Sequence, residues 1–148
     1  MDKDSSQRAH SIRYKESADG LTEDHLRGTF FVGWPNPPSP ATHLRILQGS
    51  DHIVVAIDDA TGMVVGFVTA VSDGVLAAFI PNLEVDPAYQ RRGIGTELMQ
   101  RMLAQLGHLY AVDLLCDEEL QPYYERLGMR RATGMVHRNY DRQSGSVA

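Results

Sequence analysis

The sequence predicts an α/β fold built on a mixed, twisted sheet that combines antiparallel hairpin strands with one parallel strand pair and has helices on its flanks. Two β-branched runs, 53–57 and 63–68, surround a glycine-containing turn, which favours an antiparallel hairpin. Beyond Gly93 the apolar residues recur every three or four positions, as on one face of a helix. A second strand at 109–116 then completes a strand-helix-strand crossover, which joins parallel strands.

The first third of the chain predicts a strand, two helices and a rigid loop. Alternating residues at 12–15 indicate a half-buried strand, and 21–27 indicates a short helix with acidic residues in its first turn. Four prolines fall between residues 35 and 40, which excludes a helix interior or a central strand. Ser39 is placed to cap a helix that continues to Gly49.

The remaining elements follow from periodicity and from chain breakers. The run 75–85 predicts a long strand, and Pro81 inside it predicts a bulge, where a backbone donor is not needed. The nearly continuous apolar run 109–116 indicates a strand covered on both faces. A last short helix is expected at 120–127, and residues 129–140 are expected to return as a strand.

Length and composition predict a single domain over residues 1–148. The chain has 148 residues, of which 43% are apolar and 22% charged. Residues 1–10 and 141–148 are polar or small without periodicity, so both are expected to be flexible tails. Cys116 is the single cysteine, which excludes an internal disulfide and a cysteine-clustered zinc site.

Charge and hydropathy argue against two classes of partner, nucleic acids and membranes. A net charge of −5 and a pI near 5.6 argue against nucleic acid as a partner. The sequence shows neither a secretion signal nor an apolar run long enough to span a bilayer, so we expect a cytoplasmic protein without a membrane partner. The six histidines show no metal-ligand spacing, so no metal is expected, and a homodimer is left open.

A glycine-containing segment between the predicted strand and helix is the clearest functional signal. Backbone amides at a helix N-terminus are unpaired, and glycines let an anion such as a pyrophosphate approach them. The spacing fits neither a P-loop nor a dinucleotide-binding fingerprint, and a tight turn without a ligand is the alternative explanation. The segment comprises Gln90, Arg91, Arg92, Gly93, Ile94, Gly95 and Thr96.

Two segments resemble one family. Residues 83–98 resemble the acetyl-coenzyme A binding motif of the GNAT (GCN5-related N-acetyltransferase) acyltransferases, with Gln/Arg-x-x-Gly-x-Gly/Ala after a strand that ends near Val-x-Pro. Residues 123–129 are similar to the aromatic-Tyr-Glu-x-x-Gly-Phe segment of that family. The resemblance implies the GNAT acyltransferase fold, in which the parallel strands splay apart and acetyl-coenzyme A, the acyl donor, lies between them.

The same resemblance implies the donor-binding residues. Backbone groups from Leu83 to Val85 would pair with the pantetheine arm, and amides from Arg91 to Thr96 would hold the pyrophosphate. Gln90 and the two arginine side chains belong to the same implied site, and Arg91 and Arg92 can add charge-assisted contacts. The chain departs from the family pattern at Asp117, where the family commonly has an asparagine that contacts the pantetheine. Asp117 is alternatively a cap for the last helix.

The resemblance also implies the chemistry. Tyr124 matches the tyrosine that protonates the departing thiolate, whereas Tyr123 is the expected core residue, although either side chain can be core. Glu84 alternates with its apolar neighbours and is expected beside the cleft, as the base or through a water relay. A solvated acid on a strand is the alternative for Glu84.

The acceptor side is expected on the proline-braced loop. Phe31, Trp34 and Asn36 would form an aromatic-bearing wall that suits a small molecule or a peptide end. We therefore expect acetyl transfer from acetyl-coenzyme A to a primary amine. A non-catalytic domain that binds or senses acyl-coenzyme A is the alternative, since it needs the glycine segment but neither Tyr124 nor Glu84.

Overall fold

The computed structural model describes residues 11–146, which contain one five-stranded sheet. The strands lie side by side in chain order, and all neighbours are antiparallel except the parallel pair β4 and β5. The predicted mixed α/β architecture is therefore confirmed. The strands are β1 (Ile12–Lys15), β2 (His52–Asp58), β3 (Val64–Ser72), β4 (Ala77–Val85) and β5 (Ala111–Leu114).

Helical elements lie between β1 and β2, between β4 and β5, and after β5. Ser39 caps α2 as predicted, since its Oγ accepts a hydrogen bond from the Thr42 backbone N at 3.1 Å. The helix predicted at 21–27 is only one 3-10 turn, η1. No helix within residues 11–146 is long and apolar enough to cross a membrane. The helical elements are η1 (Glu23–Leu26), α2 (Pro40–Gly49), η2 (Pro87–Tyr89), α3 (Ile94–Gln105), η3 (Glu118–Leu120), α4 (Gln121–Arg126) and η4 (Tyr140–Arg142).

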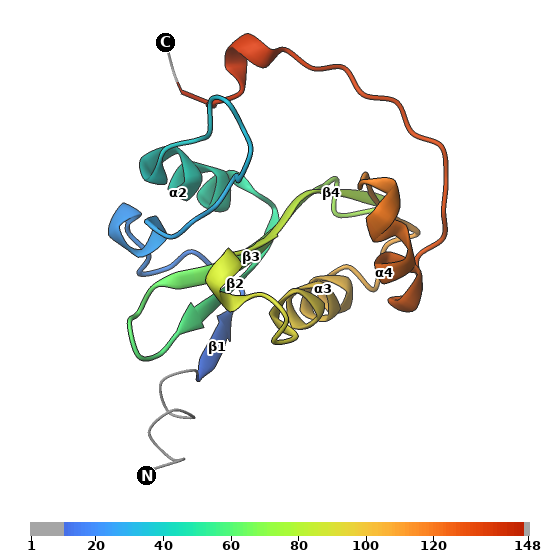
Figure 1. The fold of residues 1–148 in the computed structure, drawn as a ribbon. Helices are drawn as coiled ribbons and strands as arrows, with labels where there is room; N and C mark the ends of the chain where they lie inside the picture. The colour runs from blue at the N-terminus through green and yellow to red at the C-terminus, as the bar shows by residue number, and fades with distance from the viewer. Residues whose placement is uncertain (1–10, 147–148) are drawn as a thin grey trace.

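The central strands are buried on both faces. Figure 1 shows α2 on one side of the sheet and α3 on the other. Alternating residues of β2 divide between two apolar clusters: Val54 and Ala56 pack in the cluster with α3, while Ile53 and Val55 pack in the cluster with α2. This two-sided packing gives the strands that carry the candidate site a rigid base.

A bulge in β4 coincides with the point where the parallel strands separate. Thr69 pairs with Asn82 but Val71 pairs with Phe79, so β4 carries one extra residue in this stretch, which includes Pro81. The predicted bulge is confirmed. The last parallel pair joins Ile80 to the final residue of β5, so β4 continues from Pro81 to Val85 without β5 beside it.

The expectation that 109–116 is covered on both faces is wrong. The strand exists, but it spans only Ala111–Leu114, and Asp113 is exposed while Leu115 keeps 45% of its surface accessible. Within residues 11–146 β5 is one of the two edge strands of the sheet, with a strand neighbour on one side alone.

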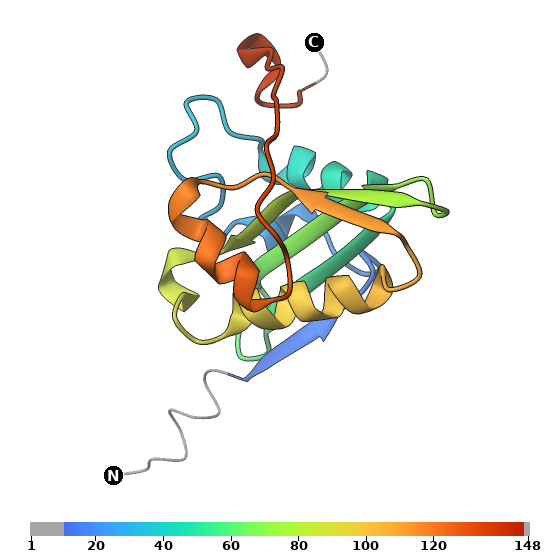
Figure 2. The same cartoon turned by 90° about the vertical axis from the view of Figure 1, so that its right-hand side faces the viewer.

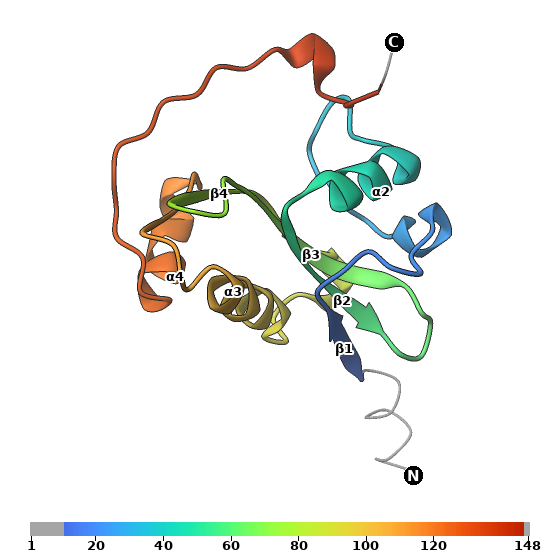
Figure 3. The ribbon, with the colours of Figure 1, turned by 180° about the vertical axis from the view of Figure 1, so that it is seen from behind.

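The strand expected at 129–140 is also wrong. Residues 130–143, which we name the strap, run from the end of α4 to η4 on the α2 side of the molecule (Figures 1 and 3). The strap pairs with no strand among the described residues, and Met135 is 93% exposed. Three arginines, a histidine and an asparagine fall between residues 130 and 139, which leaves few apolar groups to stabilise an added strand.

The structure describes only part of the two segments that are predicted to be flexible tails. Residues 1–10 and 147–148 lie outside the described residues. At the C-terminal side, η4 begins at Tyr140, and the Gln143 side chain accepts a hydrogen bond from the Asn36 backbone N at 2.9 Å. The flexibility expected for 141–148 stays a prediction.

Candidate functional site

A cavity of about 820 Å³ lies where β4 and β5 separate. Most of its walls come from the separating strands and the residues that follow them, and the others come from the proline-rich loop, α4 and the strap. Predicted site residues from distant parts of the chain meet here. They are Trp34, Leu83, Glu84, Val85, Gln90, Asp117 and Tyr124.

The free edge of β4 forms one wall. Beyond Ile80 its backbone N–H and C=O groups on the β5 side have no strand partner, and Pro81 has no N–H to donate. The side chains of Leu83 and Val85 pack against the α3 cluster, so they can meet a ligand at this edge only through their backbone, of which the Val85 carbonyl already has a partner. Gln90 closes this end of the wall, since its Nε2 donates to the Val85 carbonyl at 3.2 Å. An extended chain with amides, such as a pantetheine arm, fits such an edge.

The start of α3 forms a loop with unusual backbone angles. Gly93 has a φ of 79° and Arg91 a φ of 65°, both in the left-handed region, and no side chain caps the helix. The amides of residues 94–96 therefore have no intrahelical or capping partner. Ile94 is buried, so it offers only its backbone to a ligand. Arg92 lies 5.2 Å above the Tyr89 ring, which keeps a positive charge beside these amides.

The two tyrosines of α4 have different surroundings. Tyr124 packs against the α3 cluster and lines the cavity, and burial raises the pKa of its phenol to about 12. Its hydroxyl has no hydrogen-bond partner among residues 11–146. The Tyr123 hydroxyl lies 3.2 Å from Thr96 Oγ1, at the start of α3. The expectation that Tyr123 is the core member of the pair is therefore reversed.

Glu84 is held by the loop that precedes α2. Its Oε1 accepts a hydrogen bond from the Phe31 backbone N at 2.7 Å. Burial raises the pKa of the Glu84 carboxyl, and this hydrogen bond opposes the rise. Phe31 has a φ of 57°, a left-handed conformation that is uncommon for a residue with a large side chain. The loop thus keeps a strained backbone angle at the residue that contacts the carboxylate.

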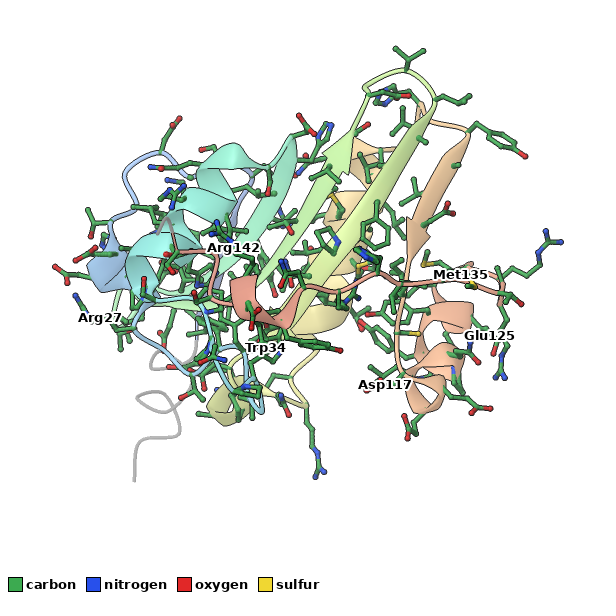
Figure 4. The ribbon with its side chains drawn as sticks, turned by 90° about the horizontal axis from the view of Figure 1, so that it is seen from above. Arg27, Trp34, Asp117, Glu125, Met135 and Arg142 are labelled. Atoms are coloured by element: carbon green, nitrogen blue, oxygen red, sulfur yellow. The ribbon has the colours of Figure 1, made fainter. Side chains whose placement is uncertain are left out.

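Phe31 and Asn36, both predicted acceptor-binding residues, do not line the cavity. Phe31 is 4% exposed and supports Trp34 instead, with ring centroids 5.0 Å apart. Asn36 is exposed and joins the loop to the strap through Gln143. Of the three predicted residues only Trp34 reaches the cavity, and in Figure 4 its ring points from the loop toward the side where Asp117 lies.

Sequence reasoning missed a second attachment of the same loop. Thr29 N donates to Asp86 Oδ2 at 3.0 Å, and a Cβ on Gly28 would lie 2.9 Å from that oxygen. Two acidic residues of the β4 segment, Glu84 and Asp86, therefore hold the loop at positions 29 and 31. The sequence signal for this contact is Asp86 at the end of a predicted strand, and that position does not identify Thr29 as its partner.

Asp117 does not cap the last helix as expected. It precedes η3 without a side-chain capping hydrogen bond, and α4 begins later, at Gln121. Its carboxylate belongs to the cavity wall next to Cys116. No group of three or more His, Cys, Asp or Glu side chains in the described part of the chain has the arrangement of a metal site.

Comparison with known proteins identifies the family. The sequence profile of the Acetyltransferase (GNAT) family matches residues 21–129. GCN5-related N-acetyltransferase 1 of Arabidopsis thaliana, a chloroplastic protein, is 30% identical over 123 residues, which are 82% of this chain but 60% of the relative. The chain thus spans about three fifths of the length of that relative.

Solved structures share the fold. A protein from Deinococcus radiodurans R1 is 50% identical and superposes with a TM-score of 0.88, covering 93% of this chain and 94% of its own. An aminoglycoside N-acetyltransferase in complex with coenzyme A has the same fold at 19% identity, with a TM-score of 0.60 over 87% of this chain and 94% of its own. Together with the profile match over most of its length, these similarities show that this chain belongs to the GNAT family of acetyltransferases.

Proposed function

We propose that this protein transfers the acetyl group of acetyl-coenzyme A directly to a primary amine of a small molecule or a peptide. Membership of the GNAT family supports acetyl transfer and the use of an acyl-coenzyme A donor. The observation that carries the proposal is that one cavity is lined by the free edge of β4, by Tyr124 and by Glu84.

The donor half of the site follows from the geometry. The free backbone of Leu83 to Val85 would hold the pantetheine arm, and the uncapped amides at the start of α3 would hold the pyrophosphate. Arg91 and Arg92 add positive charge next to those amides. When bound, acetyl-coenzyme A supplies the acetyl group as a thioester.

Glu84 and Tyr124 would handle the protons. The attacking amine must be neutral, and the Glu84 carboxylate accepts its proton directly or through a water. The raised pKa of Glu84 makes it a better base at neutral pH than an ordinary carboxylate. A new N–C bond forms as the C–S bond breaks, and sulfur receives a proton. The Tyr124 phenol stays protonated at neutral pH and donates to the developing thiolate.

The pKa of Tyr124 also decides whether its phenol transfers a proton or donates a hydrogen bond. A thiol has an ordinary pKa of about 8.5, so full transfer of a proton from a phenol of pKa about 12 is uphill. We therefore assign the larger part of its effect to the hydrogen bond that the phenol donates while the C–S bond breaks. The thiolate of coenzyme A then takes its proton from solvent or from the amine nitrogen.

Thiol release in the presence of a panel of amines tests the proposal. The protein is incubated with acetyl-coenzyme A, free thiol is measured over time, and a mass gain of one acetyl group is sought on each amine. We expect release that depends on the amine, and slower release for Glu84→Gln than for the matched exposed control Glu119→Gln. Tight binding of acetyl-coenzyme A without amine-dependent release would instead identify a non-catalytic binding domain.

A further inference from the structure

We propose that the amine acceptor carries an anionic group, a carboxylate or a phosphate, and that Arg138 of the strap binds it. This inference rests on the proposed function and specifies its substrate class. It starts from the part of the cavity that the family resemblance leaves unassigned, which is formed by Val32 and Trp34 of the loop and Arg138 of the strap.

Arg138 is the single cationic side chain among the described residues that line the cavity. It forms no hydrogen bond or ion pair with any residue between 11 and 146. By contrast, Arg131 in the same strap is engaged by Glu125, with Nη2 to Oε1 at 2.9 Å. A guanidinium in a cavity without an internal partner keeps its full set of donors, which match the geometry of carboxylate and phosphate oxygens.

The strap is attached to the rest of the protein on both sides of Arg138. Four residues before it, Gly134 lies directly on Leu115, where a Cβ would come within 2.5 Å of the leucine Cδ2. Five residues after it, Gln143 is bonded to the backbone of the proline-rich loop that carries Trp34. Figure 4 shows Trp34 beneath this end of the strap, and Figure 2 shows the strap crossing the molecule beside α4. These two attachments flank Arg138, an exposed residue that lines the cavity.

The charges around the cavity suit an acceptor with both an amine and an anion. Glu84 and Asp117 provide carboxylates for the amine, and Arg138 provides the single cation, at a separate segment of the wall among the described residues. Trp34, which is 40% exposed, offers an apolar surface for the carbon skeleton in between. A polyamine would pair with the two carboxylates but leave Arg138 unpaired with a like charge near it, so a polycation is the acceptor that competes with this proposal.

The test compares matched amines that differ by one anionic group. The carboxylate arm uses phenylalanine against phenylalaninamide, the phosphate arm uses O-phosphoethanolamine against ethanolamine, and spermidine is the polycation. We expect kcat/KM from thiol release to be at least about tenfold higher for the anionic member of one pair, which identifies the anion. In Arg138→Gln that preference disappears, whereas Arg142→Gln, on the strap but outside the cavity wall, retains it.

Trp34 is the single tryptophan of the chain, so its fluorescence reports acceptor binding without turnover. Titration of each amine in the presence of coenzyme A should show weaker binding of the anionic member to Arg138→Gln than to the parent. Selective binding without acetylation would contradict the proposed function but support the anion site. The anion proposal is overturned if Arg138→Gln keeps the preference, if spermidine is the best acceptor, or if the variant raises KM for acetyl-coenzyme A equally with every amine.

Discussion

A buried histidine predicts how the stability of this protein depends on pH. His43 of α2 is 1% exposed, and its Nε2 has no hydrogen-bond partner among residues 11–146. The rings of Phe30, Phe31 and Phe67 surround it at centroid distances of 5.2, 5.2 and 4.3 Å. Burial lowers the pKa of His43 from 6.5 to about 4, because the apolar surroundings disfavour the charged imidazole. The folded protein thus keeps His43 neutral at pH 7.

The size of the effect follows from the two pKa values. Between pH 6.5 and 4 the unfolded chain protonates this histidine and the folded chain does not, so acid favours unfolding. With about 1.4 kcal/mol for each pKa unit, the loss in free energy of unfolding is roughly 2 kcal/mol at pH 5. The loss approaches roughly 3 kcal/mol once the pH reaches 4.

Urea unfolding, followed by far-UV circular dichroism at pH 7.5 and at pH 5, measures this loss. His43→Phe and His43→Leu remove the titrating group and keep an apolar side chain, so their stability should fall less between the two pH values than that of the parent. The exposed control His108→Gln should follow the parent. Other groups titrate in all variants, so the comparison between proteins isolates His43. Equal pH dependence in the parent and both His43 variants would refute the reasoning.

Three further predictions concern the site. Tyr124→Phe should lower kcat by about 10²–10⁴ with little change in acetyl-coenzyme A affinity, whereas Tyr123→Phe should retain most activity, and equal losses in two folded variants would contradict the assignment. Gly95→Glu should abolish acetyl-coenzyme A binding in calorimetry while circular dichroism stays unchanged, because it adds an anion where the pyrophosphate is expected. Gly93→Asp should abolish binding through both the added anion and the strain of a side chain at a left-handed φ, and normal affinity in both variants would exclude this loop. Protonation of the amine lowers kcat/KM with acid in every variant; the parent should show an additional fall below the raised pKa of Glu84, and Glu84→Gln should lack that additional fall at a lower overall rate.

Features that depend on local patterns could be predicted from the sequence. The hairpin, α3 and the bulge at Pro81 follow from periodicity and from the missing N–H of proline, and all are present. The motif residues Glu84 and Tyr124 were expected beside one cleft, and both line the cavity, although their roles stay predictions.

Features that depend on distant partners could not be predicted. The hydrogen bond from Phe31 to Glu84 joins residues 53 positions apart, and no periodicity records it. Its consequence is that Phe31 acts through its backbone, not as the ligand-facing aromatic side chain that was expected. The course of the strap could not be predicted for a related reason. A strand forms only where a sheet edge is available to pair with it, and the sequence of residues 129–140 does not say whether such an edge exists.

The separation of β4 from β5 divides the protein into halves that tolerate change differently. The donor half consists of hydrogen-bonded strands and α3, so substitutions there also disturb a shared core. The acceptor half consists of the strap and a loop, which are attached by a few side-chain to backbone hydrogen bonds and by Phe31 in the α2 cluster. Evolution or a protein engineer can therefore redesign the residues that choose the amine, Arg138 among them, while the acyl donor and the fold are inherited unchanged.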